Sequence, residues 1–92
     1  MKLIYRQHAI RRMFERAISE AEVRQVLESG RVIEAYPDDT PYPSALLLGY
    51  SADRPLHVVY ADIEGENERI IITVYEPDPA RWEADLATRK PS

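Results

Sequence analysis

Two apolar stretches decide the fold of this chain: PLHVVYADI at residues 55–63 and ERIIITVYE at residues 68–76. Both are rich in β-branched and aromatic residues, and a short connection containing Gly65 separates them. This pattern predicts two β-strands joined as an antiparallel hairpin. Because apolar side chains occupy both faces of each strand, we expect the sheet to be covered on both sides.

The register of this hairpin determines which side chains lie together. If the more apolar faces of the two strands coincide, that face carries Leu56, Val58, Tyr60, Ile70, Ile72 and Val74. The opposite face then collects His57, Val59, Ala61, Ile71, Thr73 and Tyr75. We therefore expect the His57 imidazole to lie beside the side chains of Thr73 and Tyr75.

Hydrophobic periodicity predicts two helices and two further strands upstream of the hairpin. They are a helix at residues 6–16, a helix between Ser19 and Gly30, and strands at residues 31–36 and 44–50. Ser19 and Glu22 form a capping box at the start of the second helix. Gly30 is expected to end that helix in the left-handed conformation.

The segment after the hairpin begins with Asp78 and Pro79, which are typical of a helix start. We expect a short C-terminal helix here, with Trp82 and Leu86 facing the sheet. The predicted fold is therefore α+β: an N-terminal helical hairpin packed on a four-stranded antiparallel sheet, followed by a short C-terminal helix. We expect a single domain over residues 1–87, and a frayed tail at residues 88–92.

The first predicted helix has two distinct faces. Steps of about 100° per residue place the apolar side chains on one side, namely Ala9, Ile10, Met13, Phe14 and Ala17. The opposite side carries His8, Arg11, Arg12, Glu15 and Arg16. This helix is therefore amphipathic, with a basic polar face that contains a histidine.

Composition restricts the class of protein. The chain of 92 residues has no cysteine, which excludes disulfides and thiolate metal sites and favours a cytoplasmic location. The sequence has no apolar run long enough to span a membrane, and its first residues do not form a signal peptide. Residues 1–31 carry a net charge of +3 and residues 32–92 a net charge of −7. A basic patch is thus confined to the N-terminal helix, whereas a nucleic-acid-binding protein is usually basic overall.

His8 and His57 are the side chains whose unperturbed pKa lies near neutrality. Beside Arg11 and Arg12, the His8 imidazole is suited to exchange a proton with a bound phosphate, although a solvated helix face has the same pattern. His57 lies in an apolar strand, where a histidine is either a buried hydrogen-bonding residue or part of a site. For Tyr75, the alternatives are a structural partner of His57 and a group that donates a proton or orients a phosphate.

No pattern in the sequence points to a metal or a cofactor. The acidic stretch at residues 62–68 lacks the alternating oxygen ligands of a calcium loop. The two histidines do not form a zinc motif, and no glycine-rich phosphate loop is present. We therefore expect neither a metal ion nor a cofactor.

Several motifs together resemble a bacterial family known as domain of unknown function 4258. They include His8…Arg12-Met13, Val23…Val26-Leu27…Gly30, Tyr36-Pro37-Asp38, Pro41-Tyr42-Pro43-Ser44, Arg54-Pro55-Leu56-His57-Val58-Val59 and Ile72-Thr73-Val74-Tyr75-Glu76-Pro77-Asp78-Pro79. This family is similar to the RelE and BrnT toxins, which are small ribonucleases with helices packed on an antiparallel sheet. The toxins are often paired with an antitoxin protein.

The resemblance implies a metal-independent endoribonuclease from a toxin–antitoxin module. In such enzymes a base activates the 2′-hydroxyl, cationic groups stabilise the transition state and an acid protonates the leaving oxygen. The candidates for these roles are His57, Arg12 and His8, in that order, with Tyr75 as an auxiliary residue. The substrate-binding candidates are Arg11, Arg16 and Thr73, and the implied partners are RNA and an antitoxin.

The alternative is a non-catalytic interaction module on the same fold, which forms a homodimer or binds another protein. The two hypotheses differ in the expected arrangement of the candidate residues. The enzyme hypothesis is favoured if His8, Arg12, His57 and Tyr75 converge in an open cleft. An interaction module is favoured if His57 is buried and hydrogen-bonded while His8 points into bulk water.

Overall fold

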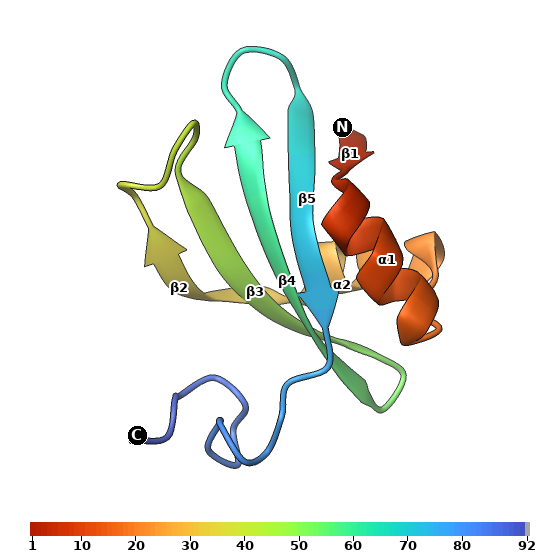
Figure 1. Cartoon of the computed structure of the whole chain (residues 1–92), viewed down its shortest axis with the longest axis vertical. Helices are drawn as coiled ribbons and strands as arrows, with labels where there is room; N and C mark the ends of the chain where they lie inside the picture. Colours follow the sequence, from red (N-terminus) through yellow and green to blue (C-terminus); the bar gives the residue numbers. More distant parts are fainter. Residues whose placement is uncertain (92) are drawn as a thin grey trace.

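The computed structural model describes residues 1–91, which form two helices and a five-stranded mixed sheet (Figure 1). In chain order the elements are β1 (Lys2–Tyr5), α1 (Gln7–Glu15), α2 (Glu20–Ser29), β2 (Arg31–Tyr36), β3 (Ser44–Ser51), β4 (Arg54–Ile63) and β5 (Glu68–Tyr75). The strand order across the sheet is β1-β5-β4-β3-β2. The predicted α+β class and the two N-terminal helices are confirmed, but α1 and α2 pack on the sheet rather than closely on each other.

The strand β1 was not predicted, and it changes the description of the sheet. It pairs in parallel with β5, from Lys2 opposite Glu68 to Tyr5 opposite Ile71. The prediction of a four-stranded antiparallel sheet is therefore wrong, because a fifth strand is present and its pairing is parallel. A strand of four residues is too short to show a clear periodicity. Its partner also lies at the far end of the chain, so no local signal marks the pairing.

The strands β2, β3, β4 and β5 form the predicted antiparallel arrangement. The turn from β3 to β4 places Ala52 at a φ of 54°, and the turn from β4 to β5 places Gly65 at 83° and Asn67 at 52°. Asparagine and glycine tolerate this left-handed region, and both are common in hairpin turns. These two turns set the order of the three central strands.

The predicted register of the β4–β5 hairpin is correct at one end and wrong at the other. His57 pairs with Tyr75 and Val59 with Thr73, so the expected neighbours of His57 are confirmed. A β-bulge follows, because Tyr60 pairs with Ile71 and leaves Ile72 as the extra residue on β5. Ile71 consequently joins the helix-covered face and is fully buried there. The prediction had placed Ile71 on the His57 face.

The two helices cover one face of the sheet and form the apolar core with it. Fully buried core residues include Val23 and Val26 from α2, and Leu56, Val58 and Val74 from the sheet. Burial of a Val or Leu side chain contributes about 1.5–3 kcal/mol, so these contacts are the largest stabilising contribution to the fold. His57 lies next to Leu56 in β4 and therefore points to the opposite face.

The start of α2 has the predicted cap, but the end of α2 does not have the predicted conformation. The Glu22 backbone N–H donates to Ser19 Oγ at 3.1 Å, and the Ser19 N–H donates to Glu22 Oε1 at 3.0 Å, which confirms the capping box. Gly30 has a φ of −84°, so the expected left-handed conformation is wrong. A Cβ at this position would lie 2.5 Å from the Leu47 side chain. Close packing against β3, rather than backbone conformation, explains the glycine.

The apolar face of α1 is only partly covered. Ala9 is buried and Met13 packs against the core, but Ile10 is 55 % exposed and Phe14 is 88 % exposed. The helix is short and contacts the sheet mainly through β5. Its narrow contact therefore leaves two large apolar side chains in solvent.

The segment after β5 forms turns, and the predicted C-terminal helix is wrong. The backbone N–H groups of Arg81 and Trp82 both donate to the Asp78 carbonyl, but no further helical turn follows. The Asp85 side chain accepts from the backbone N–H groups of Ala87 and Thr88. Such local side-chain bonds compete with a helix. Leu86 has a φ of 59°, which a right-handed helix also excludes.

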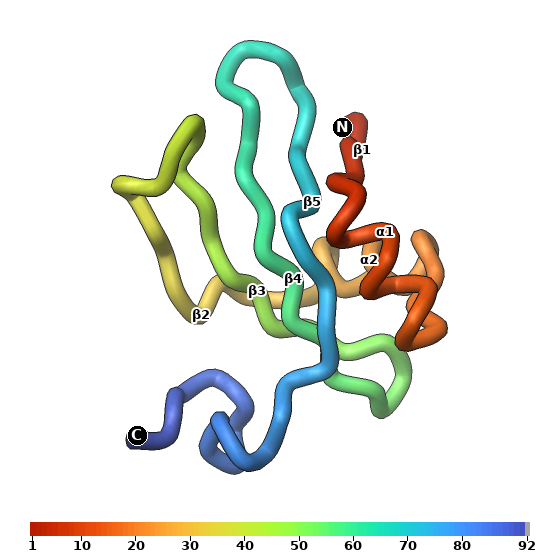
Figure 2. The backbone as a smooth tube through the Cα atoms, viewed as in Figure 1, coloured from red at the N-terminus to blue at the C-terminus, as the bar shows by residue number. Residues whose placement is uncertain are grey.

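The segment crosses the lower end of the sheet and ends near β2, as the backbone trace shows (Figure 2). As predicted, Trp82 is buried against the sheet. Arg89, which was expected to belong to a frayed tail, instead contacts Trp82 and donates two hydrogen bonds to Glu34 of β2. Ser92, the last residue of that tail, lies outside the described residues. The segment therefore covers the lower part of the face that the helices leave open.

Candidate functional site

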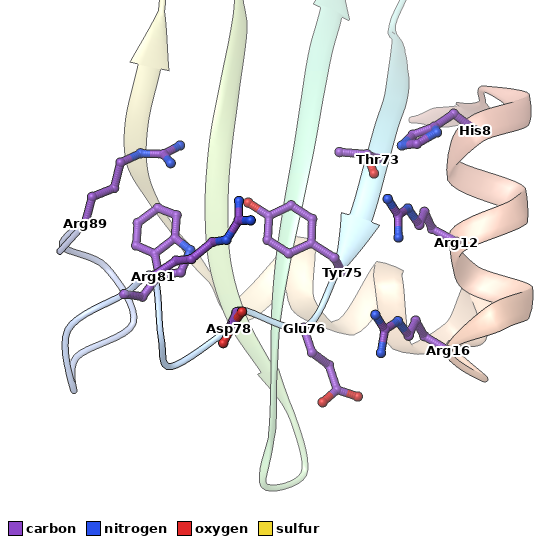
Figure 3. Close-up of a pocket in the computed structure, with 10 residues that line it drawn as sticks. His8, Arg12, Arg16, Thr73, Tyr75, Glu76, Asp78, Arg81 and Arg89 are labelled. Carbon is purple, nitrogen blue, oxygen red and sulfur yellow. The ribbon is translucent and has the colours of Figure 1, made fainter. Parts of the chain in front are cut away.

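A cleft of about 490 Å³ lies between α1, the end of β5 and the C-terminal segment (Figure 3). We call it the arginine cleft. It is lined by His8, Arg12, Arg16, Thr73, Tyr75, Glu76, Asp78, Arg81, Trp82 and Arg89. Four arginines and one histidine therefore meet two carboxylates in a space that is open to solvent.

One side of the arginine cleft is formed by α1. His8, Arg12 and Arg16 are four residues apart, so the helical repeat places them in one row on the side of β5. The guanidinium of Arg54, at the start of β4, donates to the backbone carbonyls of Arg16 and Ala17. These bonds tie the end of α1 to the sheet and so fix this wall of the cleft.

The floor of the cleft contains Tyr75, whose hydroxyl is bonded to the buried His57. The His57 ring is fully buried, with Nδ1 3.2 Å from the Tyr75 hydroxyl and Nε2 2.7 Å from the Leu86 carbonyl oxygen. The rings of Tyr75 and Trp82 both meet this imidazole edge to face, with centroids at 5.2 Å and 4.6 Å. His57 thus lies directly behind the cleft, and Tyr75 separates it from the solvent.

Burial controls the protonation of both residues. It lowers the pKa of His57 below its usual value, although the bond to the Leu86 carbonyl opposes this change. Burial also raises the pKa of Tyr75, while the nearby charge of Arg89 acts in the opposite direction. At neutral pH the His57 ring is therefore a neutral imidazole and Tyr75 is a neutral phenol.

The other side of the cleft comes from the C-terminal segment. The Arg89 guanidinium lies 4.6 Å from the centroid of the Trp82 ring, and its Nε is 2.9 Å from Oε2 of Glu34. Hydrogen bonding to Arg89 lowers the pKa of Glu34, so this carboxylate stays ionised. The charge of Arg89 is therefore already neutralised by Glu34 of β2, and its guanidinium group is engaged in contacts within the protein.

Three other arginines of the cleft are not neutralised in this way. Within residues 1–91, the guanidinium groups of Arg12, Arg16 and Arg81 take part in no ion pair. Both carboxylates of the cleft have other partners. Glu76 accepts from Arg54 at 2.7 Å, and Asp78 accepts from the backbone N–H of Ala80 at 2.9 Å. The unpaired guanidinium groups make the cleft suited to an anion with several oxygens.

The structure brings together five of the seven site residues predicted from the sequence. His8, Arg12, Arg16, Thr73 and Tyr75 all line the arginine cleft. His57 does not line it and reaches it only through the Tyr75 hydroxyl. Arg11 is also outside the lining, because it lies about 100° around the helix from Arg12.

The sequence did not indicate the part of the site that follows β5. Arg81, Trp82 and Arg89 lie in the segment that was predicted as a helix and a tail, and none was proposed as a site residue. The pattern of two arginines around one tryptophan is the available signal. This pattern has no fixed spacing and does not show which surface the segment covers. The segment is placed by the hydrogen bond between His57 and the Leu86 carbonyl oxygen, which exists only in the folded chain.

Residues 1–91 contain no cluster of three or more His, Asp or Glu side chains arranged to hold a metal ion. No helix within this part of the chain is long and apolar enough to cross a membrane.

Comparison with known proteins identifies the family. The model of the family described as "Domain of unknown function (DUF4258)" matches residues 5–76, and the chain belongs to this family. Among curated proteins and solved structures, none matches the chain. The resemblance to the RelE and BrnT toxins stays a prediction. The matched region contains α1 and β5, whereas Arg81, Trp82 and Arg89 lie beyond it.

Proposed function

We propose that this chain is a metal-independent endoribonuclease of a bacterial toxin–antitoxin module, and that RNA is cleaved in the arginine cleft. One observation carries the proposal: a solvent-accessible imidazole, a phenol and three unpaired guanidinium groups line the same cleft. They come from both ends of the chain, from His8 in α1 to Arg81 after β5. Such a combination of proton-carrying and cationic groups can supply the acid–base catalysis and charge stabilisation that metal-independent phosphodiester cleavage uses.

Arg12 and Arg16 are proposed to bind the phosphate that is cleaved. A guanidinium group is permanently charged and offers parallel N–H donors that match phosphate oxygens. The same groups stabilise the additional negative charge of the transition state, in which phosphorus has five oxygen neighbours. Arg81 supports this binding from the C-terminal segment, which forms another side of the cleft (Figure 3).

His8 is proposed to act as the general acid. In the reaction the ribose 2′-oxygen loses its proton and forms a bond to phosphorus, while the bond from phosphorus to the 5′-oxygen breaks. The His8 imidazolium supplies the proton to that 5′-oxygen. The products are a 2′,3′-cyclic phosphate and a free 5′-hydroxyl group. His57 is buried behind Tyr75 and so takes no direct part as a base, in contrast to the role considered from the sequence.

The test is to incubate RNA with the purified protein in the presence of a metal chelator and to analyse the ends of the fragments. We expect cleavage with 2′,3′-cyclic phosphate ends, and a rate reduced about 10²- to 10⁴-fold in His8→Ala, as is typical of a general acid. Arg12→Ala is expected to reduce the rate strongly as well. Arg11→Ala is the matched control, because it removes a neighbouring arginine of α1 that does not line the cleft.

Two outcomes would contradict the proposal. Cleavage that is unchanged in both His8→Ala and Arg12→Ala would place the reaction elsewhere or assign it to a contaminating nuclease. The absence of cleavage with any RNA, free or ribosome-bound, would leave the arginine cleft as a binding site without this activity.

A second candidate function is a non-catalytic module that pairs with a copy of itself through α1. It is favoured by the exposure of Phe14 and Ile10, which lie one turn apart. Two such helices packed about a two-fold axis cover each other's apolar patch, so the same surface serves as its own partner. Sedimentation velocity tests this function: the native chain is expected to be a dimer and Phe14→Ser a monomer. A monomeric native chain would contradict it.

A further inference from the structure

The hydrogen bonds of His57 determine the direction of the Tyr75 hydroxyl proton. The Leu86 carbonyl oxygen can only accept, so Nε2 of His57, at 2.7 Å, must carry a proton and donate it. A neutral imidazole has one N–H, and Nδ1 is therefore an acceptor. The Tyr75 hydroxyl lies 3.2 Å from Nδ1 and consequently donates its proton to it.

This arrangement decides what Tyr75 offers to a ligand in the arginine cleft. A phenol has one O–H, and in Tyr75 it is used by His57. Within residues 1–91 the Tyr75 oxygen has no other hydrogen-bond partner, so its remaining lone pair is an unused acceptor. A phosphate oxygen, which is also an acceptor, is a poor partner for it. The group that meets Tyr75 should be a hydrogen-bond donor placed beside a phosphate.

The ribose 2′-hydroxyl is such a donor, and it distinguishes RNA from DNA. We infer that Tyr75 is the specificity-determining residue of the cleft, which accepts a hydrogen bond from the ribose 2′-hydroxyl next to a phosphate held by Arg12 and Arg16. His57 does not touch the ligand and acts through Tyr75, whose hydroxyl it orients. This inference rests on the proposed function for its substrate class and adds a preference of the binding step for ribose over deoxyribose.

The same contact provides a path for the proton that the 2′-hydroxyl must lose. The 2′-hydroxyl proton passes to the Tyr75 oxygen while the Tyr75 proton passes to Nδ1 of His57. The resulting imidazolium keeps its second N–H on the Leu86 carbonyl. The 2′-oxygen then bonds to phosphorus, and the leaving 5′-oxygen takes the proton of His8. Since burial raises the pKa of Tyr75, a free phenolate is disfavoured, and the two proton transfers should occur together.

The inference is tested by measuring the binding of two mononucleotides, which contain no internucleotide bond that the protein could cleave. Uridine 3′-monophosphate and 2′-deoxyuridine 3′-monophosphate differ only in the 2′-hydroxyl, and titration calorimetry or NMR titration gives their dissociation constants. We expect the ribonucleotide to bind about 3- to 10-fold more tightly, as one hydrogen bond to a neutral acceptor allows. Tyr75→Phe should abolish this difference. Tyr50→Phe is the matched control, because Tyr50 is exposed on β3 outside the cleft.

A second measurement needs no substitution and remains decisive if Tyr75→Phe fails to fold. The nitrogen chemical shifts of a ¹⁵N-labelled sample report which ring nitrogen of His57 carries the proton. We expect protonated Nε2 and unprotonated Nδ1 in the native chain at neutral pH. Protonated Nδ1 would reverse the bond to Tyr75, turn the Tyr75 proton toward the ligand and overturn the inference.

The inference and the proposed function fail in different experiments. Equal affinity for the two nucleotides, or no binding of either, would overturn the inference whatever happens to RNA. A ribose preference that is lost in Tyr75→Phe but retained in Tyr50→Phe would support it, even if no cleavage occurs. Cleavage of RNA that depends on His8, together with equal nucleotide affinities, would support the proposed function and reject Tyr75 as the 2′-hydroxyl acceptor.

Discussion

The two faces of the sheet are covered in different ways. On one face, α1 and α2 pack on aliphatic side chains such as Leu56, Val58 and Val74, which are fully buried. On the other, a segment with no regular secondary structure is held by a histidine, two aromatic rings and an ion pair. The first face depends on buried aliphatic area, whereas the second combines buried apolar side chains, namely Leu46, Leu48 and Trp82, with a few directional contacts.

This difference between the two faces shows which part of a small domain can carry reactive side chains. On the helix-covered face the fully buried sheet residues are aliphatic, and the buried Tyr5 hydroxyl has no hydrogen-bond partner within residues 1–91. The second face keeps an imidazole and a phenol in contact with each other and, through Tyr75, with a solvent-filled cleft. The groups of the candidate site therefore collect where α1, the end of β5 and the C-terminal segment meet, and substitutions can test whether both covers belong to one cooperative fold.

The largest effect is expected for Trp82→Ala. This substitution removes the side chain that fills the second face and contacts both His57 and Arg89, so the free energy of unfolding should fall by about 3–5 kcal/mol. Urea denaturation measures it, and Trp82→Phe should cost less because a ring remains against His57. A loss below about 1 kcal/mol would mean that the C-terminal segment does not take part in the cooperative fold.

Leu56→Ala tests the helix-covered face, with an expected loss of about 2–5 kcal/mol. Leu56 is fully buried in the core, and the small side chain leaves a cavity beneath the helices. The matched control is Val32→Ala on the edge strand β2, where the side chain is 48 % exposed and the loss should stay near 0.5 kcal/mol. Similar losses at the two positions would contradict the described core.

The pH dependence of stability between about pH 5 and 7 distinguishes the two faces, because the buried histidine lies on the second, whereas the buried Tyr5 hydroxyl on the first has its pKa raised to about 12. Burial lowers the pKa of His57 in the folded state, so below about pH 6.5 the unfolded chain binds more protons than the folded chain. The contribution of His57 is complete above that pH and decreases as the pH falls, by at most about 1.4 kcal/mol per unit.

Urea denaturation at several pH values between about 5 and 6.5 measures this slope. His57→Gln should make it smaller, since the titrating group is gone. The lowered carboxyl pKa values of Glu22 and Glu34 affect stability only at more acidic pH, below about 5, so they do not interfere. A slope in the native chain that equals the slope in His57→Gln would show that His57 is not buried in its neutral form.

The smallest effect is expected for Arg89→Ala. Its side chain is 58 % exposed, so the ion pair with Glu34 and the contact with the Trp82 ring together should contribute less than about 1 kcal/mol. Thermal unfolding of Arg89→Ala and Arg89→Lys compares the loss of both contacts with the loss of the planar guanidinium alone. A loss above about 2 kcal/mol in either variant would assign Arg89 a larger role in closing the second face.

Much of the fold could be predicted because it is encoded locally. The alternation of apolar residues identifies β4 and β5, and Ser19 with Glu22 identifies the start of α2. The bulge at Ile72 could not be predicted, because the run from Ile70 to Ile72 looks equally apolar in either register. Similarly, nothing in Lys2–Tyr5 indicates that its partner is a strand at the other end of the domain.

The candidate site likewise contains one part that the sequence predicted and another part that it could not predict. The row of His8, Arg12 and Arg16 follows from the helical repeat, and all three residues line the cleft. The separation of Arg12, which lines the cleft, from Arg11, which does not, depends on how α1 is rotated against β5. The position of Arg81 depends on the path of the C-terminal segment, which has no periodicity to indicate its direction.

The sequence by itself determined the α+β class, the two N-terminal helices and the position of His57 beside Tyr75, because each depends on the spacing of residues that are close along the chain. Only the tertiary structure decided that His57 lies behind the cleft while His8 lines it. That outcome depends on the bond from His57 to the Leu86 carbonyl, which joins residues 29 positions apart. Contacts of this kind are made by a segment that packs on an existing sheet, and no local periodicity specifies them.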